Sequence, residues 1–213
     1  MTSAVRALRD ESGSAELESS DVAFSGRVWD IRRDTFQLND ESITREYMDH
    51  TGAVAILALD EQDRVLLINQ YRHPVRARLW EIPAGLLDID AEHPLDAAKR
   101  ELAEEADVEA AEWAVLSEFY TSPGSSDEAI RIYLARGVTA LPERFDREAE
   151  EADIEKRWVS LDEITDAVRA RAVQNPSLVT GVLSAYIAGE RGWTGLGAAD
   201  ADWPRLRQRG TAE

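Results

Sequence analysis

Three glutamates in one short segment have the spacing of a cooperating group. Glu101, Glu104 and Glu105 occupy positions i, i+3 and i+4 within 94–106, a segment whose apolar residues recur at helical spacing. Their side chains are therefore expected on one face of a helix. Three neighbouring carboxylates repel one another, and a hard divalent cation such as Mg²⁺, which prefers oxygen ligands, relieves that repulsion. Taken alone, however, three such glutamates more often form a solvated acidic helix face.

The residues around this helix favour the metal interpretation. A bend is expected at 83–85 (Pro-Ala-Gly), where exposed backbone offers a carbonyl ligand and Gly85 permits a sharp turn. Arg100 adjoins the first glutamate, and Glu92 lies just before the helix. A glycine bend, an acid, seven residues and then Arg-Glu-Leu-x-Glu-Glu form a pattern that chance rarely produces.

This pattern resembles the Nudix box, whose usual form is Gx5Ex7REUxEExGU, where U is aliphatic. The matching residues are Gly85, Glu92, Arg100, Glu101, Leu102, Glu104, Glu105 and Val108. The chain departs from the motif twice: six residues rather than five separate Gly85 from Glu92, and Asp107 replaces the second glycine. Asp107 must end the helix in a conformation that aspartate tolerates better than most residues. Neither departure touches the metal-facing acids.

The resemblance implies a metal site and the residues that build it. Glu101 and Glu105 are implied as metal ligands, Glu104 as a further or shared ligand, and the backbone carbonyl of Ala84 as another. Arg100 is implied to hold the carboxylates in place through charge-assisted hydrogen bonds, with a purely structural ion pair as the alternative. The implied cofactor is Mg²⁺, with Mn²⁺ as a substitute, and Glu105 and Arg100 count among the implied catalytic residues.

Three further segments resemble the ADP-ribose pyrophosphatases within the Nudix superfamily. Pro123 lies about fifteen positions after the box, and the stretches 70–74 (Gln-Tyr-Arg-His-Pro) and 80–85 (Trp-Glu-Ile-Pro-Ala-Gly) also match. An ordinary turn is the alternative for the proline segment. The substrate-binding residues implied by this likeness are Arg72, Glu81, Gly124 and Glu128. For Arg72, whose planar guanidinium suits phosphate, a surface ion pair is the alternative, and Glu128 has the alternative of a solvated loop acid.

An acidic stretch at 148–153 supplies candidates for the general base. Similar enzymes place a mobile glutamate of this loop over the metals, where it takes a proton from the attacking water. We predict Glu151 as the base, with Glu150 as the second choice. A solvated charge run is the alternative.

These features predict Mg²⁺-dependent hydrolysis of the pyrophosphate bond of ADP-ribose to AMP and ribose 5-phosphate. One alternative is a Nudix hydrolase for NADH, a diadenosine polyphosphate or a nucleotide sugar such as GDP-mannose. Another is a non-catalytic nucleotide-binding module, against which the intact acids argue.

The composition excludes several other functions. The 213 residues contain no cysteine, which rules out thiol chemistry, and only three histidines, whose spacing gives no hint of a zinc site. The net charge of −18 repels nucleic acid and anionic membranes, so neither is an expected partner, and a nucleotide substrate is expected to need divalent cations. No apolar run spans a bilayer and no secretory signal begins the chain, so the expected location is cytoplasmic.

The order of expected elements predicts an α+β fold. Strands often follow one another directly, so the sheet is expected to be mixed, and the resemblance implies a Nudix-type α/β/α sandwich. We divide the chain into a disordered segment 1–20, an N-terminal β subdomain 21–50 built on an antiparallel strand pair, a Nudix domain 51–191 and a C-terminal tail 192–213. The tail contains Trp193 and Trp203, which favour packing onto the body.

By resemblance, the N-terminal strands exchange across a two-fold homodimer and help to hold the adenine. Phe24, Trp29 and Phe36 are the aromatic residues available there, and plain core packing is the alternative for each.

Overall fold

The computed structural model describes residues 8–13, 15–143, 145 and 154–206. The chain forms two compact units, Met1–Asp49 and His50–Glu213. Within the described residues, no helix is long and apolar enough to cross a membrane.

The first unit is a three-stranded antiparallel meander, which contains the predicted antiparallel strand pair and adds one strand to it. Its strands are β1 (Glu16–Ser25), β2 (Asp30–Leu38) and β3 (Glu41–Asp49), in spatial order β1-β2-β3. Asn39 and Asp40, both at positive φ, form the two-residue turn between β2 and β3, as hairpin geometry requires. Strand β1 begins inside the segment expected to be disordered, because backbone pairing with β2 from Glu16 onward orders a stretch that has little apolar surface of its own.

The second unit is built on two sheets. Its elements are β4 (Ala53–Ala58), β5 (Arg64–Arg72), a 3-10 turn (His73–Val75), β6 (Ala77–Glu81), β7 (Ala84–Leu86), α1 (Pro94–Ala106), β8 (Val108–Tyr120), β9 (Ala129–Ala140), β10 (Glu155–Ser160), α2 (Leu161–Arg169), α3 (Pro176–Glu190) and β11 (Gly197–Ala198). The larger sheet has the order β11-β8-β9-β4-β7 and is mixed, since β4 runs parallel to β9 and antiparallel to β7. The smaller sheet, β10-β5-β6, is antiparallel.

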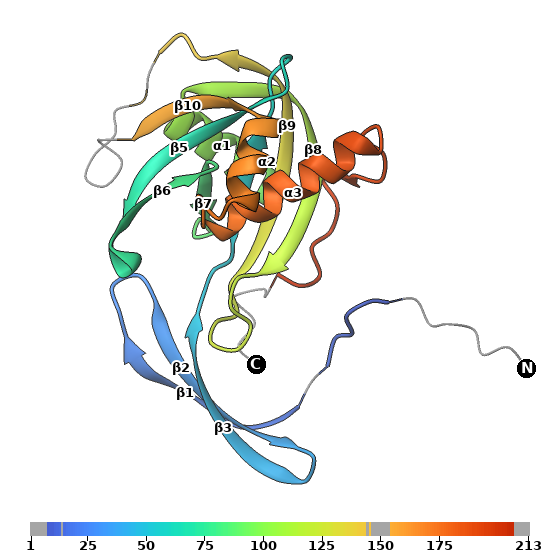
Figure 1. Cartoon of the computed structure of the whole chain (residues 1–213). Coiled ribbons are helices and arrows are strands. Elements are labelled where there is room, and N and C mark those ends of the chain that lie inside the picture. Colours follow the sequence, from blue (N-terminus) through green and yellow to red (C-terminus); the bar gives the residue numbers. More distant parts are fainter. Residues whose placement is uncertain (1–7, 14, 144, 146–153, 207–213) are drawn as a thin grey trace, which may run out of the picture. The chain divides into compact units, whose positions relative to one another are not determined.

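Strand β4 shows why the larger sheet is covered by helices on both faces. All its residues are buried. Its odd-numbered side chains join a cluster that includes Leu178 and Val182 of α3, and its even-numbered side chains join another that includes Ala98 and Leu102 of α1. Helices α2 and α3 therefore cover one face and α1 the other (Figure 1). The predicted α+β fold with an α/β/α sandwich is confirmed.

Helix α1 has the bounds that the sequence predicts, and both of its ends are capped. Nδ1 of His93 accepts a hydrogen bond from the Leu95 amide at 3.2 Å, and Pro94 occupies the first turn, where a missing N–H costs nothing. At the other end, Asp107 adopts the left-handed conformation, with φ 57° and ψ 37°. The predicted role of Asp107 in place of the motif glycine is thus confirmed.

Candidate functional site

Arg100 is the centre of an acidic cluster on α1. Its Nε and Nη2 donate to the two carboxylate oxygens of Glu92 at 2.9 and 3.0 Å. Its Nη1 donates to Glu101 Oε1 at 2.6 Å and to Glu104 Oε2 at 3.1 Å. The hydrogen bonds from Arg100 lower the pKa of Glu92, and the same bonds raise the pKa of Arg100. Glu92 is therefore the bidentate partner of Arg100, despite the extra residue in the loop before it.

Glu105 fixes α1 against strand β7. Its side chain is buried, and Oε2 accepts a hydrogen bond from the backbone amide of Ala84 at 2.8 Å. Ala84 in turn pairs with Ala55 of the central strand β4. The acids of the helix and the backbone expected to offer a carbonyl ligand are therefore brought together by the sheet.

Gly85 serves a different purpose from the one that the sequence suggests. The expected sharp turn at 83–85 is wrong, because Gly85 lies within strand β7 and is absent from the glycines with positive φ. Instead, a Cβ on Gly85 would stand 2.0 Å from Cδ of Glu101. The absence of a side chain at Gly85 lets the carboxyl group of Glu101 lie directly on the backbone.

The donor chemistry of this cluster fits a hard divalent cation. Three carboxylates, from Glu92, Glu101 and Glu104, bind one guanidinium, and the carboxylate of Glu105 is held by the Ala84 amide, so negative charge remains for a cation to offset. Among the described residues, no three acidic or histidine side chains converge on one point as they stand. Arg100 and the Ala84 amide already engage oxygens of this group.

Two residues predicted to bind substrate bind each other. Arg72 Nε and Nη2 donate to the two oxygens of Glu81 at 2.9 and 2.7 Å. The Glu81 side chain is only 2% exposed, whereas that of Arg72 is 40% exposed. The ion pair considered as the alternative for Arg72 is therefore present. The buried Glu81 carboxylate orients the guanidinium of Arg72 through these two charge-assisted hydrogen bonds.

His50, which was not predicted as a site residue, contacts the loop that contains Gly124 and Glu128. Glu128 accepts from Thr121 Oγ1 at 2.5 Å and lies 3.2 Å from His50 Nε2. The Gly52 amide donates to Nδ1 of the same buried histidine at 3.0 Å, so its proton belongs on Nε2, facing Glu128. Gly124 lies at the exposed turn of the loop. The one sequence signal for His50 is its place just ahead of a fully apolar strand.

The predicted base residues Glu150 and Glu151 lie outside the described residues. The residues on either side of that stretch are both held by Asp107. Its Oδ1 accepts from the Phe145 amide at 2.9 Å, and its Oδ2 forms an ion pair with Lys156. The acidic stretch is thus bounded by two attachments to the C-terminal end of α1.

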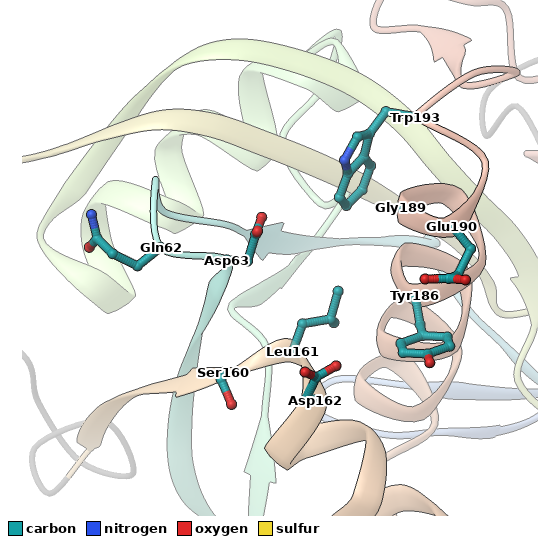
Figure 2. Close-up of a pocket in the computed structure, with 9 residues that line it drawn as sticks. All are labelled: Gln62, Asp63, Ser160, Leu161, Asp162, Tyr186, Gly189, Glu190 and Trp193. Atoms are coloured by element: carbon teal, nitrogen blue, oxygen red, sulfur yellow. The ribbon is translucent and has the colours of Figure 1, made fainter.

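A cavity of about 410 Å³ lies elsewhere in the second unit (Figure 2). It is lined by Gln62, Asp63, Ser160, Leu161, Asp162, Tyr186, Gly189, Glu190 and Trp193. None of these is a predicted site residue, and the helices that contribute to it, α2 and α3, cover the face of the larger sheet opposite α1. This cavity is therefore separate from the acidic cluster.

Comparisons with known proteins agree with this geometry. A family model described as the NUDIX domain matches residues 49–178. An ADP-ribose pyrophosphatase of Mycobacterium tuberculosis is 38% identical over 189 residues, which cover 88% of this chain and 90% of that protein. An ADP-ribose pyrophosphatase of Bacillus subtilis is 35% identical over 74% of this chain and 86% of its own length. A solved structure described as an ADP compounds hydrolase superposes with a TM-score of 0.70 at 16% identity, covering 87% of this chain and all of the other, which supports the fold.

Proposed function

We propose, from the premise that this chain belongs to the Nudix family of hydrolases, that it hydrolyses the pyrophosphate bond of ADP-ribose to AMP and ribose 5-phosphate. The observation that carries this proposal is the Arg100-centred acidic cluster, which Glu105 fixes against strand β7. The similarity to two ADP-ribose pyrophosphatases over most of the chain supports the choice of substrate.

Nudix hydrolases generally use divalent cations, and we propose Mg²⁺ here, with Mn²⁺ as a substitute. Glu101, Glu104, Glu105 and the Ala84 carbonyl would hold the metal. When bound, the cation neutralises charge on the diphosphate and lowers the pKa of an attacking water. The chain's own part is orientation: Arg100 fixes Glu101 and Glu104, and the Ala84 amide fixes Glu105.

The acidic stretch supplies the proton acceptor in this proposal. A carboxylate oxygen of Glu151, or else of Glu150, takes the proton from the attacking water. The attachments of Phe145 and Lys156 to Asp107 support this assignment, because they hold a described residue before the stretch and one after it at the C-terminal end of the helix that carries the acids.

Substrate binding is proposed for the Arg72–Glu81 pair and for the loop with Gly124 and Glu128. Arg72 presents a planar set of donors suited to phosphate oxygens, and Glu81 holds that plane fixed from the protein interior. Glu128 accepts a hydrogen bond from Thr121 and contacts His50 Nε2, and these two interactions hold the base of the loop.

A substrate panel tests the proposed function. The purified protein is incubated with Mg²⁺ and ADP-ribose, NADH, a diadenosine polyphosphate or GDP-mannose, and phosphate is measured after phosphatase treatment. The highest kcat/KM is expected for ADP-ribose, and its loss on chelation with EDTA is expected to be reversed by added Mg²⁺. A higher value for another substrate would replace ADP-ribose, and inactivity on all four would favour a nucleotide-binding module.

The homodimer and the cytoplasmic location stay predictions. Light scattering coupled to size-exclusion chromatography tests the first, and a monomer at micromolar concentration would contradict it.

A further inference from the structure

The three residues 50–52, here called the connector, join strand β3 to strand β4 and contain a buried histidine. The side chain of His50 is only 3% exposed. Its Nδ1 accepts a hydrogen bond from the Gly52 amide at 3.0 Å, which closes a turn within the connector. Gly52 has a φ of 85°, a left-handed value that glycine adopts without strain. The direction of the His50 ring is therefore fixed by the backbone of the connector itself.

The connector is attached to the loop 121–128 through two neighbouring acids. His50 Nε2 lies 3.2 Å from Glu128 Oε1. The backbone amide of His50 donates to Asp127 Oδ1 at 2.8 Å, a contact between residues 77 positions apart in the chain. Both ring nitrogens and the amide of His50 are thus engaged, and two of these three contacts hold the base of the loop.

The loop is a closed turn, so the position of its tip follows from the position of its base. The Thr121 amide donates to the Glu128 carbonyl at 3.2 Å, and Thr121 Oγ1 donates to Oε2 of the same residue at 2.5 Å. Within the loop, the Ser126 amide donates to the Ser122 carbonyl at 3.0 Å. Gly124 lies between these two serines, and its place therefore depends on where the base is held.

The connector is also attached to the strand that meets the acids of α1. The Gly52 carbonyl accepts a hydrogen bond from the Leu87 amide at 3.0 Å, directly after β7. Strand β7 contains Ala84, whose amide donates to Glu105 Oε2 at 2.8 Å. One short segment therefore holds the base of the loop through His50 and the end of β7 through Gly52.

The strand register places these two attachments on either side of the start of β4. Ala53, the first residue of β4, pairs with Leu86 of β7 on one side and with Ile130 of β9 on the other. The loop ends at Glu128, two positions before Ile130. Two strand spacings amount to about 10 Å, so the base of the loop and the end of β7 lie within the length of one extended nucleoside diphosphate compound.

We infer that His50 is a positioning residue for substrate binding, which fixes the loop containing Gly124 and Glu128 relative to the acids of α1 without touching the substrate itself. One ligand must meet the loop and the acids at the same time, so a displaced loop weakens binding. The groups that act on the diphosphate stay in place, and the effect is therefore on KM rather than kcat. This inference rests on the proposed function, since it takes the loop to bind substrate.

Two substitutions at His50 separate the contacts of its two ring nitrogens. Asparagine accepts hydrogen bonds from the amide two residues later, as in an Asx turn, so His50→Asn keeps the bond to Gly52 and loses the contact with Glu128. Glutamine is longer and places an N–H donor near the position of Nε2, but it has no acceptor at the position of Nδ1. His50→Gln therefore keeps the contact with the loop and loses the one within the connector.

The test measures hydrolysis of ADP-ribose and calorimetric binding of its non-hydrolysable α,β-methylene analogue, both with Mg²⁺. His50→Asn is expected to raise the KM and the Kd of the analogue about tenfold, with kcat within about threefold of wild type. His50→Gln is expected to keep all three values within about threefold. Tyr120→Phe, which removes a hydrogen bond to the Arg205 carbonyl just before the loop, is the matched control and should change none of them.

Hydrogen–deuterium exchange provides a readout of the loop itself. The amides of 121–128 are expected to exchange faster in His50→Asn than in wild type, and at the wild-type rate in His50→Gln and Tyr120→Phe. If His50→Asn does not fold, as judged by thermal unfolding, Asp127→Ala replaces it, because this change removes the contact between the loop and the His50 amide. The KM is then expected to rise in Asp127→Ala.

An unchanged Kd of the analogue in His50→Asn, or in Asp127→Ala where that variant replaces it, would overturn the inference. So would an equal rise of Kd in His50→Gln, or a lowered kcat with an unchanged KM. Any of these results in an enzyme that still cleaves ADP-ribose would leave the proposed function intact. Wild-type protein that binds the analogue but does not cleave ADP-ribose would refute only the proposed hydrolysis, and wild-type protein that does neither would refute both.

Discussion

The carboxyl group of Glu101 lies directly on the backbone of Gly85. A Cβ at this position would stand 2.0 Å from Cδ and 2.3 Å from Cγ of the glutamate. No real Cβ contact is this short, so the Glu101 side chain can occupy this position only because residue 85 has no side chain. The relationship makes residue 85 part of the packing around the acidic cluster.

Gly85→Ala is therefore expected to damage catalysis more than stability. The added methyl group meets the end of a flexible side chain rather than backbone, so Glu101 moves and the fold is retained. A displacement of this kind at a reacting centre can lower activity about 100-fold. Measurement of kcat/KM against Mg²⁺ concentration, together with the melting temperature, tests this. A large loss of stability with unchanged specific activity would contradict it.

Glu105→Gln is expected to lower kcat about 100-fold or more, because it removes the negative charge of a proposed metal ligand from a buried position next to Ala84. The amide oxygen of glutamine can still accept the Ala84 hydrogen bond, so the circular dichroism spectrum should not change. Glu109→Gln, an exposed acid in β8, is the matched control and should retain wild-type activity. Equal kcat values for the two variants would refute the metal-ligand assignment.

A double-mutant cycle on the Arg72–Glu81 pair separates the contribution of Arg72 to stability from its contribution to substrate binding. Arg72→Ala leaves the buried Glu81 carboxylate without its bidentate partner, which is expected to lower the free energy of unfolding by about 1–3 kcal/mol. Arg72→Ala is also expected to raise the KM for ADP-ribose. Adding Glu81→Gln should recover much of the lost stability but should leave the KM raised. Urea unfolding and steady-state kinetics provide the two readouts. If KM also recovered, Arg72 would have no direct role in binding.

The choice between the two loop acids is tested by turnover at saturating Mg²⁺. Glu151→Gln is expected to lower kcat about 100-fold or more, the usual contribution of a general base, with little change in Mg²⁺ affinity. Glu150→Gln serves as the neighbouring control and should retain activity. The reverse result would move the base to Glu150, and full activity in both variants would remove the base from these two positions.

Asp60, in the turn between β4 and β5, makes a contribution to the free energy of unfolding that depends on pH. Burial raises the pKa of Asp60, but hydrogen bonds from the Arg64 amide, the Arg64 side chain and the Gln62 amide outweigh it and leave the pKa lowered. A lowered folded-state pKa gives stability that is present above about pH 4 and lost as pH falls through the folded value. Asp60→Asn is thus expected to cost about 1 kcal/mol at neutral pH.

Urea unfolding of wild type and Asp60→Asn at pH 7, 5 and 3 checks this. The difference in free energy of unfolding between the two proteins should be equal at pH 7 and pH 5 and should be smaller at pH 3. A difference that grows toward acid would contradict the assigned direction of the pKa shift.

Much of the fold was predictable because it follows from local patterns. Helix α1 keeps its predicted bounds because Pro94 and Asp107 are start and stop signals that act through the backbone. The first strand was not predicted, because it is ordered by pairing with β2. Its own Ser- and Glu-rich sequence gives no local signal of that pairing.

The sequence by itself determined which acids lie on one helical face, because the spacing of Glu101, Glu104 and Glu105 fixes their direction through the period of the helix. Only the tertiary structure decided what meets that face. The pairing of β7 with β4 places Gly85 against Glu101, and the connector 50–52 places His50 against Glu128. Such neighbours depend on strand pairing between residues far apart in the chain, which no local periodicity records.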